Sequence, residues 1–211
     1  MLTLFLAVLS TATPTAVEAE RAFARDARQM GQWTASRRYA HPDAVLFTPQ
    51  AIWARDFLKD RKDPPAASSW TPNASYVSCD GRFAVNTGPW RSADGRSSGF
   101  FTTVWEQSQG KWQWITDGRH TLRRTAATRK TPSVRAGSCA GRAPGAPLSA
   151  VPSTNPGPGG RTPDDFGRGQ SADKTLGWEW RVRSNGGRQF RAYLWNGRGY
   201  TLALDQAIGG K

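Results

Sequence analysis

The clearest pattern in the chain runs from Tyr76 to Asp117, where aromatic and β-branched residues alternate with turn residues. The segments YVSCDGRFAVNTGPW, GFFTTVWEQ and WQWITD are separated by a glycine-rich turn and by SQGK. Short runs of this composition between turn residues are typical of consecutive antiparallel strands. Because the connections are short, we expect these strands to pair with one another rather than with distant partners.

A helical pattern precedes these strands. From Val17 to about Tyr39, apolar positions recur at intervals of three and four residues, which predicts an amphipathic helix with a bend at Gly31. The apolar positions are Phe23, Ala27, Met30 and Thr34. The His41-Pro42 pair ends the helix, because a residue before proline avoids the α region. A short strand over residues 44–48 and a brief helix over 52–58 are expected next.

The C-terminal part begins with a change of composition. Residues 123–172 are rich in Pro, Gly, Ser and Ala and predict an irregular connection. The segments LGWEWRVR, RQFRAYLW and GYTLALD then predict three strands, joined by Asn-Gly turns at 185–186 and 196–197. Three strands are few for independent stability, so we expect this meander to pack on the main sheet or to extend it.

Two strand motifs resemble those of a known family. SCDGRFAVNTGPW (Ser78–Trp90) follows the pattern S-x-D-G-x-x-A-x-x-x-G-x-W/Y. GFFTTVWEQSQGKWQWITDG (Gly99–Gly118) follows G-x-Y/F-x-x-V-W-x-x-x-x-G-x-W-x-x-x-x-D. Both resemble the nuclear transport factor 2-like (NTF2-like) superfamily, in the branch of unknown function near the SnoaL-like and ketosteroid isomerase families. The resemblance spans about residues 17–118.

The resemblance implies an α+β fold in which the N-terminal helix packs in a curved antiparallel sheet of conical shape. Together with the patterns at the two ends of the chain, the resemblance predicts four parts. These are a signal peptide (1–16), an NTF2-like domain (17–122), a Pro/Gly-rich linker (123–172) and a three-stranded β meander packed on the main sheet (173–211). Cone folds of this kind often form homodimers through the open face of the sheet, unless the meander covers that face.

The first residues carry an apolar run, Leu2 to Leu9, followed by small residues and Pro14. This pattern resembles a secretory signal peptide cleaved near Ala16 or Ala19, and predicts export to the periplasm. The run lacks the Lys or Arg that usually precedes it, so a short buried strand is the alternative. Eight residues are too few to cross a bilayer as a helix, so no transmembrane anchor is expected.

Cys79 and Cys139 are the only cysteines. In an oxidising compartment they could close a disulfide loop of about sixty residues. The alternative is two thiols, one of them buried as a small apolar side chain. Neither cysteine has a partner at metal-ligand spacing and the chain has two histidines, so neither a metal site nor a cofactor is expected.

The net charge of +13 leaves nucleic-acid binding as a third functional hypothesis. Arg and Trp alternate over residues 178–200, where a basic sheet could stack single-stranded bases. Trp178, Trp180 and Val182 share one strand face, however, as core residues do. Nucleic acid is therefore the least favoured partner. The basic block from Arg119 to Arg142 fits a solvated linker better than an anion-binding tail.

Two functional hypotheses follow from the resemblance. In the first, the cone holds a small, partly apolar ligand among Tyr39, Trp53, Trp90 and Trp105, and no chemistry occurs. In the second, the chain is an isomerase or cyclase with a carboxylate base in the pocket, for which Asp117 is the best candidate. The alternative role of Asp117 is structural, as a strand-end residue that bonds the following turn.

Overall fold

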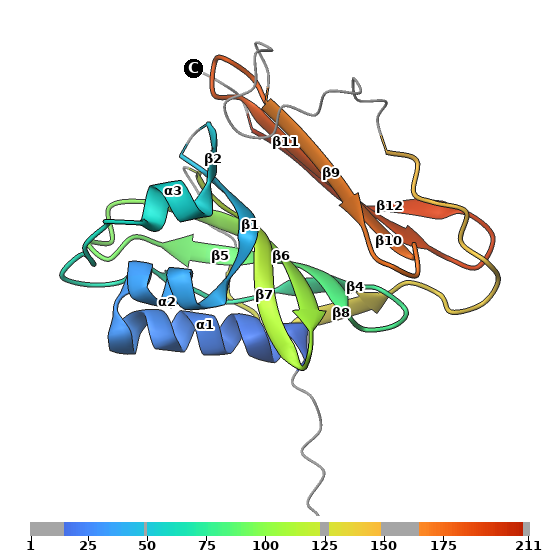
Figure 1. The fold of residues 1–211 in the computed structure, drawn as a ribbon, viewed down its shortest axis with the longest axis horizontal. Coiled ribbons are helices and arrows are strands. Elements are labelled where there is room, and N and C mark those ends of the chain that lie inside the picture. The colour runs from blue at the N-terminus through green and yellow to red at the C-terminus, as the bar shows by residue number, and fades with distance from the viewer. Residues whose placement is uncertain (1–14, 49, 123–126, 149–164, 209–211) are drawn as a thin grey trace, which may run out of the picture.

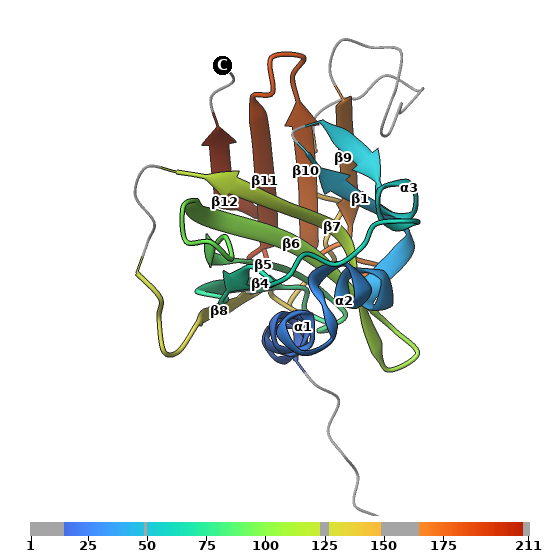
Figure 2. The ribbon, with the colours of Figure 1, turned by 90° about the vertical axis from the view of Figure 1, so that its left-hand side faces the viewer.

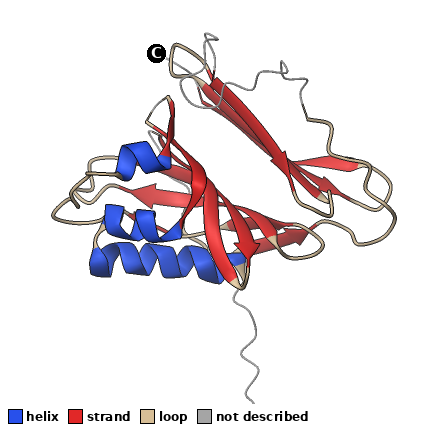
Figure 3. Cartoon of the chain, in the orientation of Figure 1, coloured by secondary structure: helices blue, strands red, loops and turns tan. Residues whose placement is uncertain are grey.

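The chain folds into three layers, a pair of helices, a curved eight-stranded sheet and a four-stranded sheet (Figure 1, Figure 2). The computed structural model describes residues 15–48, 50–122, 127–148 and 165–208. The predicted signal peptide falls almost wholly on residues 1–14, outside the described residues. Figure 3 shows that the helices gather on one side of the larger sheet. The structure is therefore α+β, as the sequence predicted.

The N-terminal helical pattern forms two helices, α1 (Ala16–Met30) and α2 (Gln32–Tyr39). Thr15 caps α1: its hydroxyl accepts from the Glu18 amide, and the Glu18 carboxylate accepts from the Thr15 amide. Gly31 separates the helices with φ of 105°, a backbone conformation that favours glycine. The bend predicted at Gly31 is thus a complete break.

A carboxylate from a distant loop caps α2. Asp63 accepts hydrogen bonds from the amides of Trp33 (2.5 Å) and Thr34 (3.0 Å) and from the Thr34 hydroxyl (2.5 Å). These contacts lower the pKa of Asp63, the hydroxyl contributing most. Gly31 leaves room for this carboxyl group, since a Cβ there would lie 2.3 Å from Asp63 Cγ. The loop therefore supplies the N-cap that α2 lacks in its own sequence.

We expect Asp63→Ala to lower the free energy of unfolding by about 1 kcal/mol, the usual value of an N-cap side chain. Equilibrium urea unfolding of the two proteins measures the difference. Asp60→Ala, which removes an exposed acid of the same loop, serves as the control. Equal losses in the two variants would contradict the capping role.

The eight strands of the larger sheet follow the order β2-β1-β7-β6-β5-β4-β8, and β3 pairs with β5. Their bounds are β1 (Ala40–Phe47), β2 (Ala51–Trp53), β3 (Ser69–Trp70), β4 (Ala74–Val77), β5 (Phe83–Arg91), β6 (Ser98–Ser108), β7 (Lys111–Thr121) and β8 (Ser133–Ala136). The central strands β5, β6 and β7 form the predicted antiparallel meander.

The prediction of a wholly antiparallel sheet is wrong. β1 runs parallel to β7, and β8 runs parallel to β4, so the sheet is mixed. Both parallel pairs join strands far apart in the chain, which local residue patterns do not reveal. The helix predicted over 52–58 is also shorter: β2 occupies its first residues and α3 is Ala54–Leu58.

The second sheet has four strands where three were predicted. They are β9 (Asp165–Gln170), β10 (Leu176–Val182), β11 (Arg188–Trp195) and β12 (Tyr200–Ile208), paired antiparallel in the order β12-β11-β10-β9. The extra strand, β9, lies in the stretch predicted to be irregular, as does β8. The two Asn-Gly turns are present, with positive φ at Gly186 (79°) and Gly197 (97°).

Two apolar cores lie on opposite faces of the larger sheet. The inner core packs α1 and α2 against the sheet and includes Phe23, Trp70, Trp105 and Trp114. The outer core lies between the two sheets, and the second sheet contributes Trp178, Trp180, Val182, Phe190 and Leu194 to it. The C-terminal sheet thus covers the face of the larger sheet that the helices leave open.

Candidate functional site

An acidic residue lies at the centre of the inner core. The buried stripe of α1 consists of small or aromatic residues, Ala16, Ala19, Phe23, Ala24 and Ala27, and of Glu20. Glu20 occupies the i+4 position from Ala16, so the helical period turns it toward the sheet. Its side chain is fully buried. An ionised carboxylate in such a place requires hydrogen-bond donors.

Three donors surround the Glu20 carboxylate. The indole nitrogens of Trp70 and Trp105 donate to it over 2.7 Å and 2.6 Å, and Asn86 Nδ2 approaches at 3.3 Å. Burial is the main cause that raises the pKa of Glu20 to about 7; the nearby Asp117 acts in the same direction and the donors oppose it. Glu20 therefore exchanges a proton near neutral pH inside the core.

Asp117 and Arg119 of β7 complete this polar group. Asp117 is 8% exposed and accepts a hydrogen bond from Thr103 (2.9 Å). Burial raises the pKa of Asp117, against the positive charges of Arg119 and Arg188. The Arg119 guanidinium lies 4.6 Å from the centre of the Trp70 ring. The Glu20 carboxylate and the Arg119 guanidinium thus both contact Trp70, and Asp117 acts on both of these charged groups.

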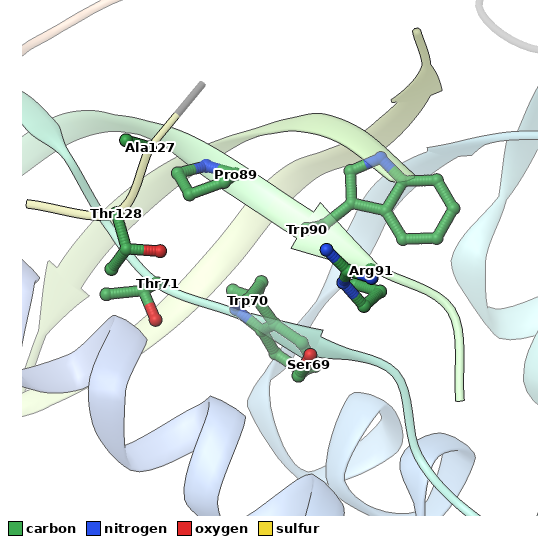
Figure 4. A pocket seen from close by; sticks show the side chains of 8 residues that line it. All are labelled: Ser69, Trp70, Thr71, Pro89, Trp90, Arg91, Ala127 and Thr128. Atoms are coloured by element: carbon green, nitrogen blue, oxygen red, sulfur yellow. The ribbon is translucent and has the colours of Figure 1, made fainter. Parts of the chain in front are cut away.

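Trp70 also lines a cavity of about 330 Å³. It opens beside the paired strands β3 and β5, as Figure 4 shows. The lining residues are Ser69, Trp70, Thr71, Pro89, Trp90, Arg91, Ala127 and Thr128. They offer hydroxyl groups, indole rings and one guanidinium, and none of them is acidic. We call this hollow the Trp70 cavity.

The structure places the four predicted ligand-binding residues in three different surroundings. Trp90 lines the Trp70 cavity and donates from its indole nitrogen to the His120 carbonyl (2.8 Å). Trp105 is fully buried against Glu20, and the Tyr39 ring lies 6.0 Å from it. Trp53 packs on the outer core, across the sheet from the other three, with Arg55 over its ring.

The predicted disulfide is present between Cys79 and Cys139. It ties the turn after β4 to the segment after β8. The same turn is bonded to the second sheet, because the Cys79 amide donates to the Thr175 hydroxyl (2.7 Å) and the Asp80 amide donates to Asp173 (2.9 Å). Cys79 therefore lies where both sheets meet.

Sequence reasoning missed Glu20, Trp70, Arg91 and Arg119. Glu20 had a signal, since an acid on an otherwise apolar helical stripe is unusual. The sequence carries no such signal for Trp70 and Arg91, because they come together only through the pairing of β3 with β5. Within the described residues, no cluster of His, Cys, Asp and Glu suited to a metal ion occurs, and no helix is long and apolar enough to cross a membrane.

Several solved structures resemble about half of this chain at low sequence identity. An NTF2-like protein of unknown function from Shewanella oneidensis MR-1 is 13% identical, with 48% of this chain and 93% of that chain covered and a TM-score of 0.40. A protein of unknown function of the DUF3225 family from Pectobacterium atrosepticum is 11% identical, covering 50% and 88%, with a TM-score of 0.40. The CamKII hub homology domain of Chlamydomonas reinhardtii is 20% identical, covering 51% and 96%, with a TM-score of 0.39.

At these TM-scores the likenesses decide nothing about fold or activity. The fold described above rests on its own strand pairing. No protein-family model and no curated protein sequence matches the chain.

Proposed function

We propose that the protein binds a small, partly apolar anion in the Trp70 cavity. The observation that supports this most is the lining of the cavity, where indole rings, three hydroxyl groups and Arg91 converge without an acid. The volume of about 330 Å³ is at the lower end of the range for small-molecule sites. An aromatic carboxylate would stack on an indole and pair its charge with Arg91.

Arg91 gives the proposal a direct test. Its side chain is exposed and free to reach a ligand from the end of β5. Binding of a panel of small aromatic carboxylates, each with its neutral amide as a partner, would be followed by ligand-observed NMR. We expect the carboxylates to bind and the amides to bind at least tenfold more weakly, which corresponds to the loss of about 1.4 kcal/mol from one charge-assisted contact.

Arg91→Gln is expected to abolish that preference for the carboxylate. Arg96→Gln is the matched control, because Arg96 lies five residues further on, in the turn between β5 and β6, with a side chain that is 88% exposed. Binding that is equal for acids and amides, or equally weakened by both variants, would rule out the proposed role of Arg91. Absence of binding across the panel would rule out the function.

A second candidate function, an isomerase or cyclase, is favoured by one observation. Asp117 and Glu20 are two buried carboxyl groups whose pKa values burial raises, as general acid–base catalysis requires of a carboxyl group that accepts a proton. Asp117→Asn should then abolish turnover of enolisable ketones or lactones. If Asp117→Asn turns these compounds over as fast as the wild type, or if the wild type turns over none of them, the two carboxyl groups have a structural role.

We also propose that the protein is exported. The Cys79–Cys139 disulfide and the apolar run from Leu2 to Leu9 both support an oxidising compartment. Cleavage at Ala16 or Ala19 would remove Thr15, which caps α1, so we expect the mature chain to begin at or before Thr15. Mass spectrometry of the periplasmic product would identify that terminus; a full-length chain in the cytoplasm would contradict export.

A further inference from the structure

A buried guanidinium lies where the two sheets meet. Arg188 begins β11 and is only 6% exposed. Among the described residues, no carboxylate lies within ion-pair distance of its side chain. Buried arginines are normally paired, because removal of an isolated charge from water is costly. Within the part of the chain that the structure describes, Arg188 therefore lacks the partner that its buried position requires.

The contacts of Arg188 cover only part of its guanidinium. Its carbon atom Cζ lies 4.0 Å from the centre of the Phe47 ring. The group also packs on Gly118, where a Cβ would come within 2.6 Å of both terminal nitrogens. Nη2 lies 3.2 Å from His120 Nδ1, whereas Nε is buried and has no hydrogen-bond partner among the described residues.

His120 leaves a second donor without a partner. Burial, together with the charge of Arg188, lowers the pKa of His120 to about 2, so the imidazole is neutral. Because Nδ1 faces an arginine nitrogen and must accept from it, the single ring proton lies on Nε2. Nε2 is also buried, and no described residue bonds to it. Both unsatisfied atoms at this junction are thus hydrogen-bond donors.

The unsatisfied atoms are all donors and lie beside a positive charge. The missing partner must therefore accept hydrogen bonds and carry a negative charge. A water molecule would satisfy a donor but not the charge, whereas an oxyanion satisfies both. The nearest carboxyl group that acts on Arg188 is Asp117, which opposes the lowering of the arginine pKa to about 9 by burial. Asp117 bonds Thr103 on the inner face of the sheet, and so does not occupy the junction.

We propose that a small oxyanion, a phosphate or a carboxylate, binds between β7 and β11, held by Nε and Nη2 of Arg188, while His120 Nδ1 accepts from Nη2 and fixes the orientation of the guanidinium. The fixed fork of a guanidinium presents these two nitrogens side by side, as bidentate binding of two oxygens requires. We call this place the junction site. It shares no residue with the Trp70 cavity, so either can be present without the other.

The test compares thermal unfolding of the wild type and of Arg188→Gln in phosphate, formate and chloride at equal ionic strength and pH. An anion present at about ten times its Kd should raise the Tm of the wild type by roughly 4 °C more than that of the variant. Use of the difference removes the general stabilisation that excluded salts give to every protein. A larger effect of phosphate than of formate identifies a phosphate site, and the reverse identifies a carboxylate site.

One arginine variant and one spectrum serve as controls. Arg191→Gln changes a half-buried, ion-paired arginine of the same strand and should keep the full anion effect. In the wild type alone, the Arg188 Nε–H resonance should shift and saturate as phosphate or formate is added. This measurement remains if Arg188→Gln does not fold. Equal anion effects in wild type and Arg188→Gln, or an unmoved Nε–H resonance, would overturn the proposal.

Discussion

Replacement of Glu20 by glutamine is expected to stabilise the protein, relative to the wild type, by about 3 kcal/mol more at pH 8 than at pH 4. Burial raises the pKa of Glu20 from 4.5 in the unfolded chain to about 7 in the fold. The fold thus holds the Glu20 proton more tightly than the unfolded chain does. Each tenfold difference in proton affinity corresponds to about 1.4 kcal/mol of stability.

The sign follows from that difference. The contribution of Glu20 to stability is fully present below about pH 4.5, falls as the pH rises, and is lost above about pH 7, where the carboxylate is ionised in both states. Glutamine has no such proton, so its contribution stays constant. Urea unfolding of both proteins between pH 4 and pH 8 measures the difference in the free energy of unfolding.

The comparison isolates Glu20 from other groups that titrate. Asp117, whose pKa is also raised, acts in the same direction. His120, with its pKa lowered to about 2, acts in the opposite direction, since its contribution is lost as the pH falls below 6.5. Both remain in wild type and variant alike. At pH 4 Glu20 is neutral, so that pH is the internal control. A difference that stays constant from pH 4 to pH 8 would contradict the raised pKa.

Removal of the disulfide is expected to cost about 4 kcal/mol, from the loss of a crosslink across a loop of sixty residues in the unfolded chain. The double variant Cys79→Ser, Cys139→Ser should therefore unfold at a urea concentration lower by roughly 2 M. The wild type in a reducing agent should match it. A reducing agent should have no effect on the double variant, which provides the control.

If the free energy of unfolding falls by well below 1 kcal/mol, other contacts already hold Cys79 near Cys139, either in the unfolded chain or in the folded protein. The hydrogen bonds from the Cys79 and Asp80 amides to Thr175 and Asp173 remain in the variant. Hydrogen exchange of those two amides would therefore report whether the sheets separate locally before the protein unfolds.

Local patterns predicted the parts of the fold that depend on near neighbours. The helix before Gly31, the meander of β5, β6 and β7 and the Asn-Gly hairpins all follow from residues within a few positions of one another. The parallel pairs β1–β7 and β4–β8 do not, because each joins segments separated by more than fifty residues. The helix N-cap from Asp63 was also beyond the reach of local patterns, because Asp63 lies 30 residues from Trp33.

The candidate site shows the same limit more sharply. Aromatic residues were expected to surround a ligand, but sequence could not assign Trp105 to the buried carboxylate, Trp90 to the Trp70 cavity or Trp53 to the opposite face. A single added residue in a strand reverses the face on which later side chains lie. Such a bulge occurs between Val104 and Trp105, where β6 pairs with β7. The pairing register of the strands therefore decides which residues each tryptophan contacts.

The placement of the C-terminal sheet constrains self-association. Trp178 and Trp180 of this sheet pack on the face of the larger sheet that would otherwise be open to a second subunit. Two protomers of this chain cannot join through that surface unless the sheet swings away and exposes Trp178 and Trp180 to water. A dimer of the intact fold would have to form elsewhere. Among the described residues the two sheets end in β2, β8, β9 and β12, and the outer edge of such a strand could pair with a second copy.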